Sequence, residues 1–229
     1  MTKKKAIVSW STGKDGAYAY HKATQSGEFE IVGLLTTITE TFERVSMHGT
    51  REALLDEQAR KLGQPILKVQ IPWPCTNEIY EEQMGKAVEQ IKAQGVTHII
   101  FGDLYLEDIR DYRLEKMKDT GLECVFPLWG LNTTKLADEM VASGLRSVLV
   151  CVDPKAIDAS FAGRVFDETL LQDLPDKIDP CGENGEFHTA VIAGPMFDSP
   201  IDVTVGEIVE RSGFIYADVS LTSDEKSVG

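Results

Sequence analysis

The sequence predicts an α/β protein in which a doubly wound parallel sheet is followed by a smaller α+β region. Short apolar runs alternate with helix-period segments up to residue 126, which is typical of parallel strands joined by crossover helices. Beyond residue 153 the segments are shorter and alternate in hydrophobicity, as antiparallel strands do. The length of 229 residues and the hydrophobic fraction of 42% suit one large domain or two small ones.

The parallel strands are predicted at residues 6–8, 30–37, 65–71, 96–101 and 123–126. Helices are predicted between them, and three of these helices end at Gly27, Gly63 and Gly95. The third begins near Asn77, where Thr76 or Asn77 caps it and acidic residues occupy the first turn. A fourth helix is predicted over residues 109–117.

Residues 127–130, Pro-Leu-Trp-Gly, mark a change of region, so we expect one domain over residues 1–130 and a second over residues 131–229. The second is predicted to contain a helix over 134–143, a buried strand over 146–152 and a short helix over 167–174. Antiparallel strands are expected over 188–193, 201–210 and 215–221. A frayed polar tail is expected over 222–229.

The composition excludes several classes of protein. The chain has 23 basic and 37 acidic residues and a formal net charge of −14, which disfavours nucleic-acid binding because that depends on Lys and Arg at phosphates. No apolar run has the length of a membrane span or of a signal-peptide core. The four cysteines are scattered without a C-x-x-C pair, which argues against a disulfide scaffold or a cysteine-rich metal site. We therefore expect a cytoplasmic protein without a membrane partner.

The turn between the first strand and the first helix is the most informative stretch of the chain. It consists of Ser9, Trp10, Ser11, Thr12, Gly13, Lys14, Asp15 and Gly16. Such a turn exposes backbone N–H groups at the positive end of a helix, which is an anion site. Ser11 and Thr12 add hydroxyl donors, Gly13 permits close approach, and Lys14 adds a charge suited to phosphate. The alternative is an ordinary strand-to-helix turn with Lys14 and Asp15 in solvent.

Other candidate nucleotide contacts follow the predicted strands. Thr36 and Thr37 end the second strand, and Gly102 and Asp103 follow the fourth, at the sheet edge where open α/β sheets bind ligands. His48 and Arg51, near the start of the second helix and on the side expected to face the site, are candidate substrate contacts, and Arg51 could also contact phosphate. For Arg51, an exposed position at the helix start is an equally good interpretation.

A second cluster occupies residues 179–189, D-P-C-G-E-N-G-E-F-H-T. Glu183 and Glu186 are bracketed by glycines and followed by His188, so they converge on one point if the loop folds back. Such a group could bind an ammonium ion, orient a substrate or act as a general acid and base. The alternative is a Gly/Asn turn with solvated glutamates.

Residues 11–16, S-T-G-K-D-G, resemble the S-G-G-K-D-S loop of the PP-loop ATP pyrophosphatases, which cleave ATP between the α- and β-phosphates. Thr12 replaces the first glycine and Gly16 the final serine. Residues 182–189, G-E-N-G-E-F-H-T, resemble the G-E-x-G-E-[FY]-x-T motif of the diphthine–ammonia ligase family, a PP-loop branch. The residues that match this motif are Gly182, Glu183, Gly185, Glu186, Phe187 and Thr189. Residues 102–103 and 126–129 resemble segments that lie between the two motifs in that family.

The resemblance implies a HUP-type ATP-binding domain, a smaller C-terminal domain over the site, and an amide-forming ligase. Such an enzyme adenylates a carboxylate, releases pyrophosphate and lets ammonia displace AMP. The resemblance implies that Lys14 and the loop bind the leaving pyrophosphate and that Asp15 holds Mg²⁺. It also implies that Glu183 and Glu186, with Gly182, Asn184, Gly185 and Thr189, surround the acceptor and the ammonia, with His188 as a further catalytic candidate.

The sequence leaves the acceptor open, because His188 stands where the ligases usually have Glu, and this form looks more like bacterial relatives. The acceptor is a small carboxylate or a diphthine-like protein side chain. Alternatives are an RNA-modifying PP-loop enzyme and a non-catalytic nucleotide-binding protein of the universal-stress type. The sequence also leaves open the ammonia source and whether the chain forms a homodimer.

Overall fold

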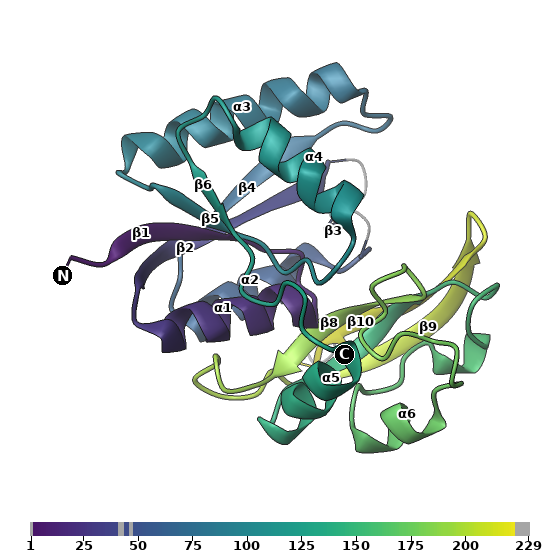
Figure 1. The fold of residues 1–229 in the computed structure, drawn as a ribbon. Coiled ribbons are helices and arrows are strands. Elements are labelled where there is room, and N and C mark those ends of the chain that lie inside the picture. Colours follow the sequence, from purple (N-terminus) through teal and green to yellow (C-terminus); the bar gives the residue numbers. More distant parts are fainter. Residues whose placement is uncertain (1, 41–43, 46–47, 223–229) are drawn as a thin grey trace.

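The computed structural model describes residues 2–40, 44–45 and 48–222 (Figure 1). The predicted tail therefore lies outside the described residues from 223 onward, as do residues 41–43 and 46–47. The described chain forms two sheets with helices around them. This confirms the predicted fold class, a Rossmann-like parallel sheet followed by a smaller α+β region.

The first sheet has β1 at its centre. Its strands are β1 (Lys4–Ser9), β2 (Phe29–Thr39), β3 (Arg44–Val45), β4 (Ile66–Ile71), β5 (His98–Ile100) and β6 (Glu123–Val125). β1 pairs in parallel with β2 and β5, β4 lies beyond β2, and β6 lies beyond β5. The strand order therefore reverses between β1 and β5, and ligands bind at such switch points in open α/β sheets. The antiparallel β3 was not predicted, because two residues are too few to show a period.

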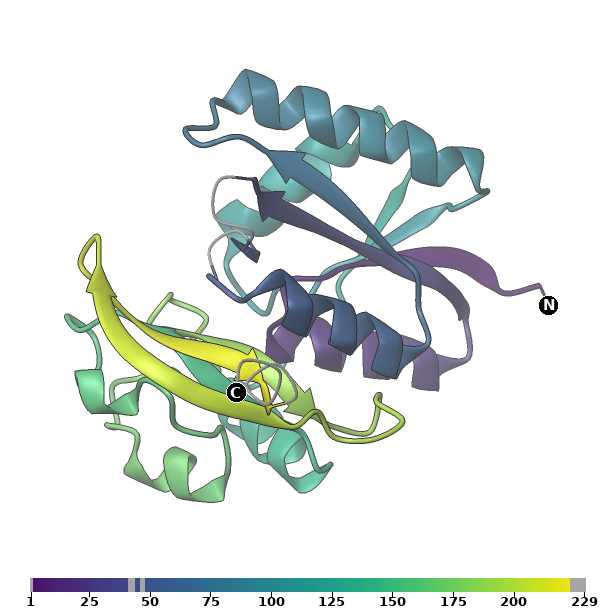
Figure 2. The ribbon, with the colours of Figure 1, turned by 180° about the vertical axis from the view of Figure 1, so that it is seen from behind.

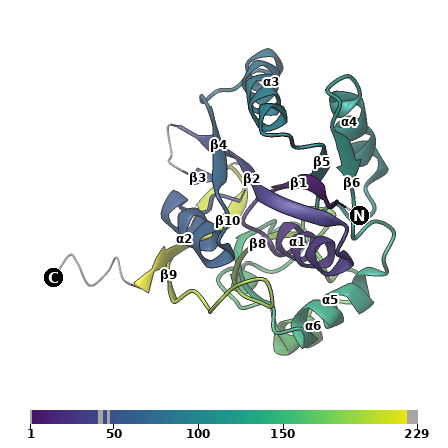
Figure 3. The ribbon, with the colours of Figure 1, turned by 90° about the vertical axis from the view of Figure 1, so that its left-hand side faces the viewer.

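The helices of this region cover both faces of the sheet. They are α1 (Lys14–Ser26), α2 (Glu52–Leu62), α3 (Asn77–Ala93) and α4 (Glu107–Met117). Figure 3 shows α3 and α4 on one face and α1 and α2 on the other. α1 and α2 end where the sequence predicts, because Gly27 and Gly63 follow them in the left-handed conformation. Thr76 is the residue that caps α3.

The second sheet is antiparallel, with the order β8-β7-β10-β9. Its strands are β7 (Arg146–Val152), β8 (Phe187–Ala193), β9 (Val203–Arg211) and β10 (Phe214–Leu221), accompanied by α5 (Thr133–Ala142), the short helix η1 (Ala159–Phe161) and α6 (Glu168–Asp173). From behind, α1 and α2 lie between the two sheets (Figure 2). The second sheet thus packs against the helices that follow β1 and precede β4.

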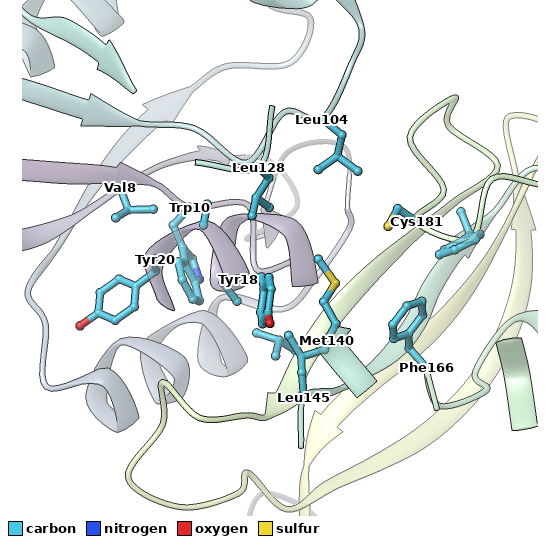
Figure 4. Packing of buried hydrophobic residues seen from close by; sticks show 14 of the residues in the cluster. Val8, Trp10, Tyr18, Tyr20, Leu104, Leu128, Met140, Leu145, Phe166 and Cys181 are labelled. Carbon is cyan, nitrogen blue, oxygen red and sulfur yellow. The ribbon is translucent and has the colours of Figure 1, made fainter. Parts of the chain in front are cut away.

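One apolar cluster of the core spans both sheets. A single cluster of buried side chains runs from Val8 and Trp10 through Tyr18 to Met140 and Phe166. Figure 4 shows these side chains on both sides of α1. The boundary at residue 130 remains a prediction. The described residues contain no helix that is both long and apolar enough to span a membrane.

Candidate active site

A cavity of about 1110 Å³ opens at the carboxyl ends of β1, β2 and β5. This volume slightly exceeds the usual range for small-molecule pockets, about 300–1,000 Å³. Both regions of the chain line it: Ser9, Trp10, Ser11, Lys14, Asp15, Gly16, Thr36, Thr37, His48, Gly102 and Asp103 from the first, and Gly182, Glu183, Phe187, His188 and Thr189 from the second. The structure therefore brings together most of the residues predicted for the site. The cavity continues between α3 and α4, where Tyr80, Met84 and Tyr112 line it.

The turn after β1 is held in an uncommon backbone conformation. Thr12 has a φ of 72°, which is a strained value for a β-branched residue and costs about 1–2 kcal/mol. Its side chain is fully buried, and its hydroxyl lies 2.9 Å from the hydroxyl of Thr50. The hydroxyl predicted to contact phosphate is therefore engaged by the protein. The ring of Trp10 also lies in the core, with 2% exposure, so only its backbone is placed near a ligand.

The start of α1 is tied to β8. The backbone N–H of Lys14 donates to the hydroxyl of Thr189 over 3.1 Å. Gly13 precedes the helix as its N-cap without a side-chain cap. A Cβ on Gly13 would lie 2.8 Å from Cε1 of His48, so glycine makes room for that ring. Thr189 therefore fixes the amino end of α1, where an anion would bind.

Lys14 extends into a slot formed by the second region. Its Nζ lies 2.9 Å from each carboxylate oxygen of Asp15 and donates to the carbonyl oxygen of Cys181. It also lies 5.5 Å from the ring centroids of both Phe166 and Phe187. Burial alone would lower the pKa of Lys14, but nearby negative charge, chiefly that of Asp15, raises it overall. Lys14 is therefore a buried cation at the junction of the two regions.

Gly102 supports the same turn from β5. A Cβ at this position would lie 2.6 Å from the backbone nitrogen of Gly16 and 2.7 Å from the backbone carbon of Asp15. Only glycine allows this approach. The neighbouring Asp103 accepts two hydrogen bonds from Arg113, at 2.6 and 3.0 Å. Its carboxylate is therefore occupied in this structure.

Thr36 and Thr37 lie at the end of β2, as predicted, and both line the cavity. Thr36 is only 3% exposed. Within the part of the chain that the structure describes, its hydroxyl oxygen has no hydrogen-bond partner. A buried, unpaired hydroxyl is costly unless a ligand or water satisfies it. This orphaned atom fits a polar ligand group at the end of β2.

Glu183 is the carboxylate of the second motif that faces the cavity. Its Oε1 accepts a hydrogen bond from the backbone N–H of Leu104 over 2.8 Å. Burial, reinforced by the charges of Asp15 and Asp103, raises the pKa of Glu183 to about 7, although the bond from Leu104 opposes this. A carboxyl group with such a pKa can exchange a proton near neutral pH.

Glu186 has a different environment. It is 7% exposed, and its Oε1 accepts from the backbone N–H of Asp179 over 3.2 Å and from Asn184 over 3.0 Å. Its Oε2 is buried and has no partner among the described residues. Glu186 thus closes the loop over residues 179–186 rather than lining the main cavity. Gly182 packs against the Phe187 ring, where a Cβ would lie 3.0 Å from it, and Gly185 has a φ of 86°.

His48 and His188 form a pair of rings above the turn, with centroids 4.9 Å apart. His48 Nδ1 lies 3.0 Å from the carbonyl oxygen of Thr189, so Nδ1 carries the proton and Nε2 is left as an acceptor. Burial, together with the charges of His188 and Lys14, lowers the pKa of His48 to about 3. Burial and Lys14 also lower the pKa of His188. Both rings are therefore neutral at pH 7.

Arg51 occupies a different position from the phosphate contact suggested by the sequence. It is the N-cap residue of α2, and its Nε donates to Asp218 on β10 over 3.0 Å. Arg44 donates to the same carboxylate oxygen over 3.0 Å. These bonds lower the pKa of Asp218 to about 2, with the bond from Arg51 as the largest cause. Arg51 does not line the cavity and instead joins the two regions.

The sequence of the diphthamide synthase N-terminal domain matches residues 4–123, and that of the diphthamide synthase C-terminal domain matches residues 132–220. The chain belongs to the diphthamide synthase family. Both family domains thus line the cavity: the first contributes most of the lining, including the turn after β1, and the second contributes residues of the glutamate motif.

The curated relatives are named diphthine–ammonia ligase. The Bos taurus and Homo sapiens proteins are each 28% identical over 159 residues, covering 63% of this chain and 59% of the relative. The Schizosaccharomyces pombe protein is 33% identical over 99 residues, covering 42% of this chain and 16% of the relative. This chain therefore matches little more than half of the mammalian proteins and a small part of the yeast protein.

Several contributors to the site were not predicted. Phe166 and the carbonyl of Cys181 hold Lys14, and Asp218 holds Arg51. No local signal marks these residues, because their roles depend on long-range packing. Gln58 is different: it stands within the apolar stripe of α2, and a polar residue in such a stripe signals a buried hydrogen-bond network.

Proposed function

We propose that the protein is an ATP-dependent ligase that adenylates a carboxylate and transfers ammonia to it, forming an amide. Two findings support the proposal: membership of the diphthamide synthase family, and relatives named diphthine–ammonia ligase. The protein's own activity and acceptor are part of the proposal, because the chain spans only 59% of the mammalian relatives.

The observation that carries the proposal is the position of Lys14. It reaches from the anion-binding turn to the carbonyl of Cys181, which directly precedes the glutamate motif. The phosphate cradle and the Glu183 carboxylate of the second region therefore face one cavity. A protein that only binds nucleotide has no use for a buried carboxylate opposite the phosphates.

In the first step, an acceptor carboxylate oxygen attacks the α-phosphorus of ATP. A bond from that oxygen to phosphorus forms, and the bond between the α-phosphorus and the bridging oxygen breaks, releasing pyrophosphate. The backbone N–H groups of the turn over residues 11–16, apart from that of Lys14, which donates to Thr189, stabilise the charge on the departing pyrophosphate together with the Lys14 ammonium. For this, Lys14 Nζ exchanges part of its contact with Asp15 and Cys181 for phosphate oxygens.

Asp15 is the residue that would hold Mg²⁺. Its carboxylate lines the cavity beside the turn, and Mg²⁺ prefers such oxygen ligands together with phosphate. The bound ion would neutralise phosphate charge. Both oxygens of Asp15 are paired with Lys14 Nζ in this structure and would be freed as Lys14 turns toward phosphate, whereas Arg113 holds both oxygens of Asp103.

In the second step, the nitrogen of ammonia attacks the acyl carbon, the bond from that carbon to the phosphate oxygen breaks, and AMP leaves. Glu183 accepts the proton that the nitrogen loses, since its pKa of about 7 allows it to be ionised near neutral pH. Glu186 and Asn184 hold the loop that carries Glu183. The neutral rings of His48 and His188 border the acceptor, and the proposal places Thr36, Thr37 and Gly102 beside the nucleoside.

The decisive experiment measures AMP and pyrophosphate from ATP and Mg²⁺, with ammonium, across a panel of carboxylate acceptors. The panel includes small carboxylic acids and elongation factor that carries diphthine. We expect AMP to form with one acceptor class only and to require ammonium for amide product. ATP that binds without ever yielding AMP would contradict the ligase and favour a nucleotide-binding protein.

A further inference from the structure

We propose that Gln58 is a positioning residue that holds the phosphate-binding turn in its left-handed conformation and connects it to β8. Gln58 does not line the cavity, and it lies on α2, outside both sequence motifs. It is nevertheless fully buried, with 0% exposure. A buried amide without full hydrogen bonding would be destabilising, so each polar atom of the Gln58 side chain needs a hydrogen-bond partner.

Each polar atom of the Gln58 side chain is used. Oε1 accepts from Nε1 of Trp10 over 2.8 Å, while Nε2 donates to the carbonyl of Thr12 over 3.1 Å and to the carbonyl of Val191 over 2.7 Å. The indole can only donate and carbonyl oxygens can only accept, so the orientation of the amide is determined by its partners. One side chain thus joins both sides of the turn, Trp10 and Thr12, to β8.

The turn needs such support because Thr12 has a φ of 72°. The resemblance to the PP-loop enzymes places glycine at this position, and glycine adopts that conformation without strain. In this chain three external contacts converge on Thr12: Gln58 Nε2 and the Val191 N–H on its carbonyl, and the Thr50 hydroxyl on its own hydroxyl. These contacts fix the direction in which the following N–H groups point.

The inference rests on the proposed function only for its binding readout, since the conformation of Thr12 can be measured without ATP. The test replaces Gln58 by Met, which conserves size and removes all three hydrogen bonds. Leu62→Ala, a core change on the same helix, controls for general loss of stability. The same Gln58→Met change is then made in a Thr12→Gly background, where the turn needs less support.

We expect Gln58→Met to weaken ATP binding about tenfold by calorimetry, since part of the energy of the three lost buried hydrogen bonds is needed to hold the turn for ATP. Leu62→Ala should lower the melting temperature without changing ATP affinity. In the Thr12→Gly background, Gln58→Met should weaken ATP binding no more than about threefold, on the same reasoning. Backbone chemical shifts of Thr12 should leave the left-handed range in Gln58→Met, and the Trp10 Nε1–H should lose protection from exchange.

A folded Gln58→Met protein with unchanged Thr12 shifts would overturn the inference, as would an equal loss of affinity in both backgrounds. If Gln58→Met does not fold, Thr50→Val decides: it removes the hydroxyl partner of Thr12, and its loss of ATP affinity must also shrink in the Thr12→Gly background. Wild-type protein that binds no ATP contradicts the proposed function alone, and the Thr12 shifts then decide the inference.

Discussion

Two loops face each other across the cavity, and they offer different groups to a ligand. The turn over residues 9–16 offers backbone N–H groups whose direction follows from the strand before it and the helix after it. The loop over residues 179–186 offers side chains whose direction depends on contacts such as Asp179 with Glu186. The first therefore combines local geometry with support from Gln58, Val191 and Thr50 on Thr12, whereas the second depends on side-chain contacts within the folded loop.

The two loops should therefore tolerate different substitutions. The turn should be sensitive to any atom that displaces its backbone, even where no charge is lost. The glutamate loop should be sensitive to the loss of one functional group at constant shape. Lys14 belongs to both, because it comes from the turn and its ammonium lies in the second region.

The strongest test of the junction is Lys14→Met. Removing the ammonium should lower AMP formation by about 10²- to 10³-fold, which is typical of the loss of one preorganised charge-stabilising group. Steady-state release of pyrophosphate measures the effect. Lys86→Met, an exposed lysine paired with Glu82 on α3, should leave the rate within about twofold, since surface pairs contribute little. Equal rates in wild type and Lys14→Met would remove Lys14 from the reaction.

Glu183→Gln tests the side-chain loop at constant shape. We expect amide formation to fall about 10²-fold, as for loss of a general base, while ATP affinity changes little. The carboxylate form accepts the proton, so at a constant concentration of free NH3 the wild-type rate should rise with pH through the Glu183 pKa of about 7, and this rise should vanish in the variant. Glu82→Gln, on the exposed surface of α3, provides the matched control. A variant that keeps the same pH profile would assign the proton to another group.

Gly102→Ala tests the backbone turn without removing any charge. The added Cβ would lie 2.6 and 2.7 Å from backbone atoms of Gly16 and Asp15, which cannot rotate away. Such overpacking should lower the free energy of unfolding by about 1–3 kcal/mol and displace the amino end of α1, weakening ATP binding. Denaturant unfolding and calorimetry measure the two effects.

Gly85→Ala is the control for Gly102→Ala. Gly85 lies within α3, and a Cβ there would meet nothing within 4 Å. Alanine should therefore stabilise the helix by about 0.5–1 kcal/mol. If both alanine variants were equally stable, the close approach of Gly102 to the turn would not matter.

The smallest effect on stability is expected at the contact that Asp218 makes between the two regions, away from the cavity. Asp218→Asn removes the carboxylate shared by Arg44 and Arg51 and should lower the free energy of unfolding by about 1 kcal/mol at pH 7, since Arg51 is partly exposed. The pKa of Asp218 is lowered to about 2 from its usual value of 3.8, so its stabilisation is present above pH 3.8. The difference from wild type should fall as the pH decreases through about 2.

Unfolding at a series of pH values measures this difference, with Asp138→Asn on the exposed side of α5 as the control. A difference that stayed constant from pH 7 to pH 2 would show that the stabilisation does not come from the ionised carboxylate. ATP affinity should change little, because neither arginine lines the cavity.

Much of the fold could be predicted from the chain. Alternating apolar runs and helix-ending glycines located the parallel strands and their helices, because these signals are local and repeat along the sequence. The short β3 escaped prediction since it exists only through pairing with the end of β2. The turn over residues 9–16 was located for the same local reason. The family resemblance added the expected roles of Lys14 at pyrophosphate and Asp15 at Mg²⁺.

The sequence by itself determined the fold class, the anion-binding turn and the presence of a second motif rich in carboxylates. Only the tertiary structure decided which side chains serve the cavity. It turned Glu183 toward the cavity and Glu186 into the loop, paired Arg51 with Asp218, and placed Lys14 between Phe166 and Phe187. A strand followed by a helix locates the backbone groups at the helix end, whereas their long-range support and the partners of a long side chain come from residues far away in the sequence.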